Sequence, residues 1–139
     1  MKTLYNGQIF SLRRSFSKQD VLLFSNLCGD KNPIHFDEEF CKKTIFKKPI
    51  IFGMLGSSLF SNLLGNNIEG SIYINQTLNF LKPIYIDEEI EATVKINGLT
   101  EPKNYLLLIT QVRKIKSDEI AIDGEALVRI PRDKYIIKL

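Results

Sequence analysis

The chain has 139 residues, of which 44% are hydrophobic and 25% are charged, and its formal net charge is +3. This length favours a single domain with a hydrophobic core of its own, and the composition is ordinary for a globular protein. The positive charge is small and scattered, and no aromatic–basic recognition motif is present, so nucleic-acid binding is not expected.

The cysteine and histidine content argues against a metal site. Cys28 and Cys41 are the only cysteines, and a single histidine cannot complete a zinc site with them, so we expect two reduced, partly buried thiols. Residues 1–7 lack the apolar run of a secretory signal. The longest apolar segment, residues 49–64, is shorter than the roughly 20 residues that span a bilayer. We therefore expect a cytoplasmic protein without a membrane segment.

The N-terminal third shows one strand signal and one helix signal. Residues 4–12 predict a first strand. Ser17 and Asp20 have the spacing of a capping box, in which a hydroxyl and an acid three residues later satisfy the first backbone N–H groups of a helix. That helix is predicted to end at Gly29.

Two further helices are predicted before the midpoint. Residues 30–36 form a loop, and Asp37 can cap a short helix that runs through Lys43. Residues 53–64 then form a helix that is apolar nearly all round, with Gly65 as its expected stop. Such a helix has to be buried.

After Gly70 the hydrophobic pattern changes to the alternation typical of strands. The predicted strands cover residues 71–80, 89–96, 105–115 and 119–130. Turns are expected at Asn97-Gly98 and at residues 116–118. The predicted fold class is therefore α+β, a single domain over residues 1–139 in which a curved antiparallel sheet wraps round the apolar helix.

The one histidine, His35, stands five residues after Asp30, across an Asn32-Pro33 turn. Imidazole exchanges protons near neutral pH, and a nearby carboxylate is a complementary acceptor. A purely structural turn, with Asp30 capping backbone groups and His35 on the surface, is the alternative. The apolar helix that begins at Gly53 favours the catalytic interpretation, because a helix start directs N–H groups at developing negative charge, as in an oxyanion hole. Gly53 could also serve tight packing, and both roles can hold together.

Two longer segments resemble a known signature. Residues 29–37 (Gly-Asp-Lys-Asn-Pro-Ile-His-Phe-Asp) and 46–55 (Phe-Lys-Lys-Pro-Ile-Ile-Phe-Gly-Met-Leu) are similar to the hydratase signature of MaoC-like proteins, above all the small R-specific enoyl-CoA hydratases. The likeness continues through residues 58–65, 70–73, 76–80 and 124–126. The resemblance implies a hotdog fold, with a sheet wrapped round a central helix, usually in a homodimer.

By this resemblance Asp30 and His35 match the catalytic pair, Gly53 matches the backbone donor to the thioester oxygen, and Ser61 matches a polar residue near the site. Asn32 is expected to shape the turn, with direct contact to water as the alternative. Many relatives have histidine immediately before Gly-Met, where this chain has Phe52. We expect this change to alter packing or substrate fit without abolishing activity.

The implied reaction is the reversible syn hydration of trans-2-enoyl-CoA to (R)-3-hydroxyacyl-CoA. Water would sit between Asp30, acting as the base, and His35, acting as the proton donor, although the sequence does not fix that division. No phosphate loop or dinucleotide fingerprint is present, so we expect no cofactor, with coenzyme A as part of the substrate.

Three alternatives remain at this stage. A 3-hydroxyacyl-acyl-carrier-protein dehydratase would use the same residues in the opposite direction, so the substrate could be linked to CoA or to a carrier protein. A non-catalytic acyl-thioester binding module would need neither Asp30 nor His35. A thioesterase would call for a carboxylate on the central helix, and residues 53–64 contain none.

Overall fold

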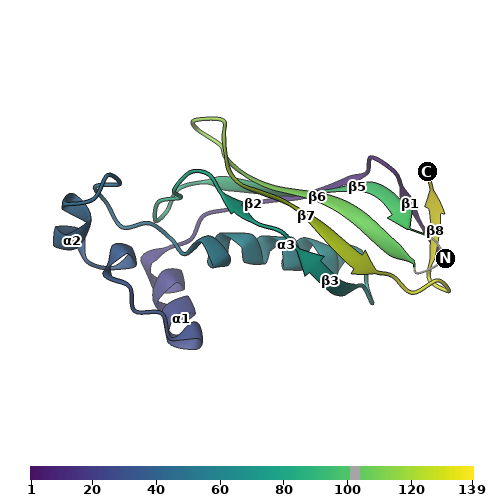
Figure 1. Cartoon of the computed structure of the whole chain (residues 1–139), viewed down its shortest axis with the longest axis horizontal. Helices are drawn as coiled ribbons and strands as arrows, with labels where there is room; N and C mark the ends of the chain where they lie inside the picture. Colours follow the sequence, from purple (N-terminus) through teal and green to yellow (C-terminus); the bar gives the residue numbers. More distant parts are fainter. Residues whose placement is uncertain (101–103) are drawn as a thin grey trace.

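The computed structural model describes residues 1–100 and 104–139 (Figure 1). The elements in chain order are β1 (Lys2–Tyr5), β2 (Ile9–Arg14), α1 (Lys18–Cys28), a short 3-10 helix (Pro33–His35), α2 (Glu38–Lys42), α3 (Gly53–Asn67), β3 (Ile72–Gln76), β4 (Asn79–Phe80), β5 (Ile90–Thr100), β6 (Tyr105–Lys114), β7 (Glu119–Arg129) and β8 (Tyr135–Lys138).

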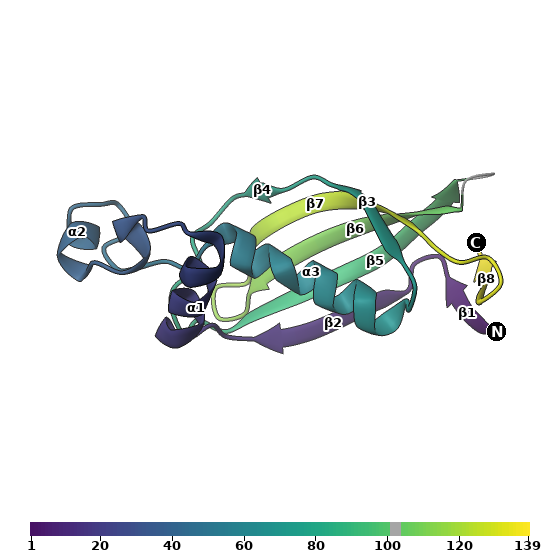
Figure 2. The ribbon, with the colours of Figure 1, turned by 90° about the horizontal axis from the view of Figure 1, so that it is seen from below.

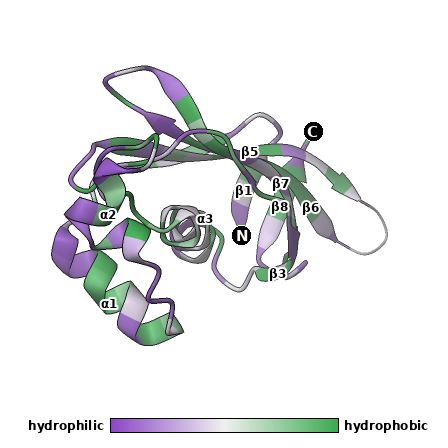
Figure 3. Ribbon diagram, turned by 60° about the vertical axis from the view of Figure 1, so that its left-hand side comes forward, coloured by the Kyte–Doolittle hydropathy of each residue, from purple (hydrophilic) through white to green (hydrophobic). Residues whose placement is uncertain are grey.

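One curved antiparallel sheet dominates the structure. Its strand order is β2-β5-β6-β7-β3, and β4 also pairs with β7. The helix α3 runs along one face of this sheet, and Figure 3 shows it nearly end-on beneath the arch of the strands. Helices α1 and α2 project beyond one end of the sheet, while β1 and β8 form a small parallel sheet at the other end (Figure 2). The predicted α+β class, with a sheet curved over a central helix, is confirmed.

The core lies between α3 and the sheet. The buried face of α3 carries Gly56, Ser57, Leu59, Phe60, Leu63 and Leu64. It meets alternate buried residues of the central strands, such as Ile90, Ala92, Val94 and Ile96 of β5. Full burial of each large apolar side chain stabilises the fold by about 1.5–3 kcal/mol. Gly56 permits the close approach, because a Cβ there would lie 3.1 Å from Ile122 Cδ1.

The expectation that α3 is buried all round is wrong for the single chain. Its outer face is exposed at Met54, Ser58, Ser61, Asn62, Gly65 and Asn66. The sheet has only one concave face, so it covers only one side of the helix. Nor is Gly65 the stop: α3 continues to Asn67, whose side-chain amide donates to the Leu63 carbonyl at 2.8 Å.

Two predicted strands are each broken in two. Residues 4–12 are divided at Gly7, which has a φ of 85° and lets the chain pass from the small sheet to the main one. Residues 71–80 are divided after Gln76. There the side-chain amide of Gln76 donates to Thr77 O and to Thr110 Oγ1, both at 2.9 Å, so side-chain bonds take over from the ladder.

The predicted turn at Asn97-Gly98 is a bulge inside β5. The strand continues to Thr100, and its register against β6 shifts between Ile96 and Leu99. Gly98 has a φ of 120°, which a glycine adopts without strain. A bulge and a turn use the same residue types, so the local signal did not separate them.

The caps of α1 and α2 follow the predictions. Ser17 and Asp20 form the capping box: the Ser17 N–H donates to Asp20 Oδ2 at 2.9 Å, and the Asp20 N–H donates to Ser17 Oγ at 3.1 Å. Gly29 ends α1 with a φ of 83°, and Asp37 caps α2 through the Phe40 N–H. These local bonds set where α1 stops and therefore where the Asp30 turn begins.

We expect Ser17→Ala to lower the free energy of unfolding by about 1 kcal/mol, because it removes one partner of the capping box. Urea unfolding at neutral pH measures this, with the exposed Ser15→Ala as the matched control.

The Ser17 backbone N–H holds the pKa of Asp20 below its ordinary 3.8. The share of stability due to Asp20 is therefore present above pH 3.8 and is lost as the pH falls through the lowered pKa. The cost of Asp20→Ala should shrink in that range, and a constant cost would contradict the assignment.

Candidate active site

The turn that carries Asp30 is held by its own side chains. Asp30 Oδ1 accepts from the Asn32 N–H at 2.9 Å, and Asn32 Oδ1 accepts from the Ile34 N–H at 3.2 Å. The Asp30 carbonyl accepts from Ser25 Oγ at 2.6 Å, which ties the turn to the last turn of α1. Asn32 thus caps the 3-10 helix that begins at Pro33, in keeping with its expected role in shaping the turn.

His35 is buried, with 8% of its surface exposed, so the alternative of a surface histidine is excluded. Its Nδ1 lies 2.6 Å from the Ile50 carbonyl oxygen. Because a carbonyl oxygen has no proton to give, Nδ1 must be the donor, and Nε2 is the nitrogen that remains for proton exchange. The ring of Phe52 is stacked on the imidazole, with centroids 3.8 Å apart and planes inclined by 32°.

Gly53 is the first residue of α3, and Phe52 is the residue that precedes it at the cap. The N–H groups of Leu55 and Gly56 donate to the Phe52 carbonyl, which is the first acceptor of the helix. The Gly53 N–H comes before these bonds, so it has no partner within the helix. Phe80 packs directly on Gly53, since a Cβ there would lie 2.5 Å from Phe80 Cε1. Tight packing and a helix-start position therefore coexist at this glycine.

Asp30, His35 and Gly53 line one cavity of about 620 Å³, near the end of the sheet from which α1 and α2 project. Most of the remaining wall is apolar and includes Phe24, Phe46, Met54, Phe80, Leu81 and Ile122, while Cys28 and Lys82 add polar groups. A carboxylate, an imidazole and a helix start thus line a space that suits an apolar molecule. Such a site can move protons on a bound chain and stabilise negative charge that develops on it.

The structure does not bring every predicted site residue to this cavity. Ser61 is exposed on the outer face of α3, and Asn32 is exposed in the turn; neither lines the cavity wall. The expectation of two partly buried thiols is also wrong. Cys28 is exposed, whereas Cys41 is fully buried and burial raises its pKa. Among the described residues, no group of three or more His, Cys, Asp or Glu side chains could hold a metal ion.

Two contributors to the site had no signal in the sequence. The Ile50 carbonyl is a backbone group, so residue identity does not reveal that it orients His35. Phe80 meets Gly53 across 27 positions of chain, a non-local contact that periodicity does not predict.

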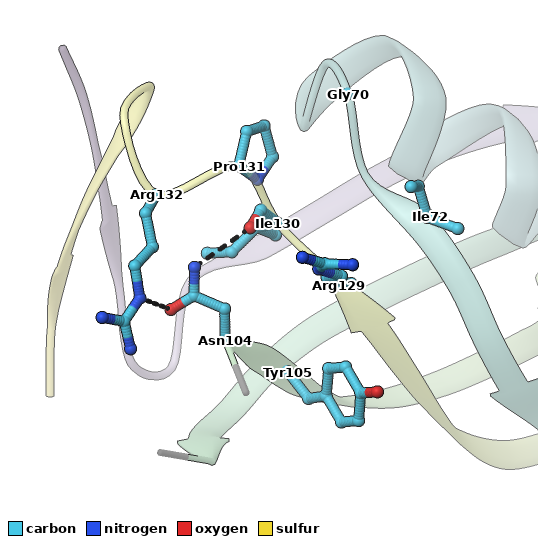
Figure 4. Close-up of a pocket in the computed structure, with 8 residues that line it drawn as sticks. All are labelled: Gly70, Ile72, Asn104, Tyr105, Arg129, Ile130, Pro131 and Arg132. Carbon is cyan, nitrogen blue, oxygen red and sulfur yellow. Dashed lines mark hydrogen bonds between the residues drawn. The ribbon is translucent and has the colours of Figure 1, made fainter. Parts of the chain in front are cut away.

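A second hollow, of about 750 Å³, lies at the opposite end of β7 (Figure 4). Asn104 spans part of it, donating to the Ile130 carbonyl at 3.2 Å and accepting from Arg132 Nε at 2.7 Å. Arg129, in its wall, is seven residues along β7 from Ile122 in the first cavity, roughly 23 Å. None of its eight described lining residues has a carboxylate, imidazole or thiol, so this hollow lacks the groups that make the first cavity a candidate for acid–base chemistry.

No helix in the described parts of the chain is long and apolar enough to cross a membrane.

Comparison with known proteins agrees with this architecture. The chain is 38% identical over 132 residues to an (R)-specific enoyl-CoA hydratase of Aeromonas caviae, covering 94% of this chain and 98% of that protein. It is also 38% identical over 126 residues to a mitochondrial 3-hydroxyacyl-(acyl-carrier-protein) dehydratase of Solanum lycopersicum, covering 90% of this chain and 76% of that one. The solved structure of the (R)-hydratase from A. caviae involved in PHA biosynthesis matches with a TM-score of 0.88 over 92% of this chain and 98% of that chain.

These likenesses confirm the hotdog fold that the sequence resemblance implied. Residues 4–116 match the family described as MaoC like domain. The match covers well over half of the 139 residues, and the chain belongs to the MaoC-like family.

Proposed function

We propose that this chain is an (R)-specific enoyl-CoA hydratase, a hydro-lyase that acts as one domain over residues 1–139. It adds water reversibly, in the syn sense, to trans-2-enoyl-CoA and yields (R)-3-hydroxyacyl-CoA. The observation that carries the proposal is that Asp30 and His35 line one apolar cavity together with the start of α3. The extended likeness to a hydratase of A. caviae supports the same reaction.

In the proposed mechanism a water molecule is held between the Asp30 carboxylate and His35 Nε2. Asp30 takes a proton from the water as the water oxygen bonds to C3. Protonated His35 delivers a proton from Nε2 to C2 on the same face. The proton gained by Asp30 then returns to His35 through solvent, which resets the pair. The hydrogen bond between His35 Nδ1 and the Ile50 carbonyl keeps Nδ1 out of this proton exchange. General acid–base catalysis of this kind contributes about 10²–10⁴-fold.

Negative charge develops on the thioester oxygen when water attacks C3. We assign the backbone N–H of Gly53 to that oxygen, because it heads α3 and lies in the same cavity wall. A single donor of this type contributes about 10²–10³-fold in other enzymes. Phe80, packed on Gly53, would hold the acyl chain close to this donor. No cofactor takes part, and coenzyme A enters as part of the substrate.

Asn32 supports this chemistry by holding the turn between Asp30 and His35. Ser61 has no proton-transfer step in the mechanism. It stands eight residues along α3 from Gly53, roughly 12 Å, on the exposed outer face of the helix and outside the cavity wall.

We propose that two copies associate through β3. This strand is an edge of the sheet, and Ile72, Tyr73 and Ile74 on it are exposed. An exposed apolar edge strand invites pairing, and a two-fold axis would satisfy both copies alike. The outer face of α3 lacks cover in the single chain, and a partner would provide it.

For location we propose the cytoplasm, with support from the two free thiols Cys28 and Cys41.

A second candidate, a 3-hydroxyacyl-acyl-carrier-protein dehydratase, is favoured by the likeness to the Solanum lycopersicum protein. An enzyme accelerates both directions of a reaction, so the same catalytic pair would serve. The two candidates differ in the group that carries the acyl chain. A comparison of kcat/KM for crotonyl-CoA and for the same acyl group on a carrier protein separates them, and activity confined to the carrier-linked substrate would favour the dehydratase.

We expect Asp30→Asn and His35→Asn each to lower kcat by about 10²–10⁴-fold, because each removes one member of the proton-transfer pair. His35→Asn is informative because its amide can still donate towards the Ile50 carbonyl while Nε2 is lost. The assay follows the loss of enoyl-thioester absorbance with crotonyl-CoA, and the exposed Asp133→Asn serves as the control. Near-normal turnover in both variants would refute the catalytic assignment, and an (S)-configured product would refute the stereochemistry.

We expect Ile74→Lys, in the middle of β3, to convert a dimer into monomers, because a charge would be placed in the paired edge. Light scattering coupled to gel filtration measures the mass. Ile9→Lys on β2, the opposite edge of the sheet, is the matched control, since Ile9 is 59% exposed and Ile74 is 43% exposed. Equal masses for the two variants would contradict association through β3.

A further inference from the structure

We propose that Phe52 is a positioning residue for His35. Its ring, stacked on the imidazole, fixes the orientation in which Nδ1 donates to the Ile50 carbonyl and Nε2 remains for the cavity. The catalytic consequence of this role rests on the proposed hydratase function. The geometric role does not, because it concerns only how the imidazole is held.

The stack is closed and buried. Phe52 has 4% of its surface exposed and His35 has 8%. Their centroids are 3.8 Å apart, and Phe24 supports the stack with its centroid 5.0 Å from that of Phe52. Phe36 meets His35 edge-on instead, at 6.2 Å and 80°. The imidazole therefore has one face against a ring that is itself held from behind.

The hydrogen bond to Ile50 does not complete the orientation by itself. It fixes the position of one ring atom, Nδ1, but leaves the ring plane free to tilt about the line that joins Nδ1 to the Ile50 oxygen. Such a tilt would move Nε2, which is joined to Nδ1 through Cε1, away from its target. The face of Phe52 opposes that tilt. A displacement of about 1 Å at a reacting group can cost about 10²-fold in rate, so this restraint matters for the proposed proton transfer.

Phe52 also links the two halves of the site through its backbone. Its carbonyl accepts from the N–H groups of Leu55 and Gly56 in the first turn of α3, at 3.1 and 3.2 Å. The residue that stacks on His35 is thus anchored to the helix whose first N–H belongs to Gly53. Phe52 therefore contacts the imidazole through its side chain and the first turn of α3 through its backbone.

The chemistry of a phenyl ring suits this role. Phe52 can neither donate nor accept a proton, so it leaves His35 as the only imidazole in the chain and offers no competing partner to Nδ1 or Nε2. An aromatic face also attracts a cation, which favours contact with the imidazolium that forms when His35 holds the proton to be delivered. A histidine at position 52, in contrast, could donate or accept a proton.

The test uses the fact that His35 is the only histidine. Protein labelled with ¹³C and ¹⁵N in histidine gives a single set of imidazole signals. In the wild-type protein we expect neutral His35 to show the Nδ1-protonated tautomer, ring protons shifted upfield by the stacked ring, and nuclear Overhauser contacts to Phe52. In Phe52→Leu we expect the upfield shift to disappear and kcat for crotonyl-CoA hydration to fall about 10-fold or more, with KM changed less than about twofold.

Two further variants complete the design. Phe52→Tyr keeps the ring and should restore the upfield shift and most of kcat. Phe36→Leu makes the same substitution at the ring that meets His35 edge-on, and should change kcat less than about threefold. Because Phe52→Leu could fail to fold, the wild-type tautomer and the His35–Phe52 contacts are measured first. Their absence overturns the proposal without any variant.

These outcomes distinguish the positioning role of Phe52 from the proposed hydratase function. An unchanged imidazole spectrum in folded Phe52→Leu overturns the positioning role, even if KM rises, because the ring would then act on substrate fit. A changed spectrum together with a loss of kcat supports it. If the wild-type protein shows the expected spectrum but hydrates no enoyl thioester, the hydratase proposal fails while the placement of His35 by Phe52 is supported.

Discussion

One face of α3 is packed against the concave face of the sheet, and the functional part of the molecule takes its position from that contact. Leu59, Phe60 and Leu63 fill the space between helix and strands, and Gly56 brings the helix close to Ile122. Once α3 is fixed in this way, its first residue, Gly53, is fixed as well. The N–H that we assign to the thioester oxygen is therefore positioned by the core, at the end of the sheet where the chain projects outward (Figure 1).

The features that could be predicted from the sequence are those encoded within a few residues. The capping box at Ser17, the glycine end of α1 and the cap at Asp37 are all local and were all correct. The breaks near Gly7 and after Gln76 depend on bonds to distant strands, so the alternation of residues concealed them. The pairing of β1 with β8 joins the two ends of the chain, and no local pattern marked it.

The site shows the same division. The spacing of Asp30 and His35 across a rigid turn predicted that both belong to one centre, and both line the same cavity. The face of α3 that carries Ser61 could not be predicted in the same way. A helix apolar nearly all round implies burial, but the sequence does not say whether the same chain or a second copy provides the cover. In the single chain Ser61 remains outside the cavity wall.

The segment at residues 50–51 joins the projecting turn to the core through backbone atoms. The Ile50 N–H donates to the Ile34 carbonyl at 3.3 Å, and the Ile50 carbonyl accepts from His35 Nδ1 at 2.6 Å. One residue further, the Ile51 N–H donates to the Ile84 carbonyl at 2.8 Å, in the chain that leads into β5. Because residues 50 and 51 make these bonds through main-chain atoms, the geometry depends little on the identity of their own side chains. The overall fold is shared with a protein that is only 38% identical, as the TM-score of 0.88 indicates. In the proposed positioning role, the side chain of Phe52 then adjusts how the imidazole is held within this backbone frame.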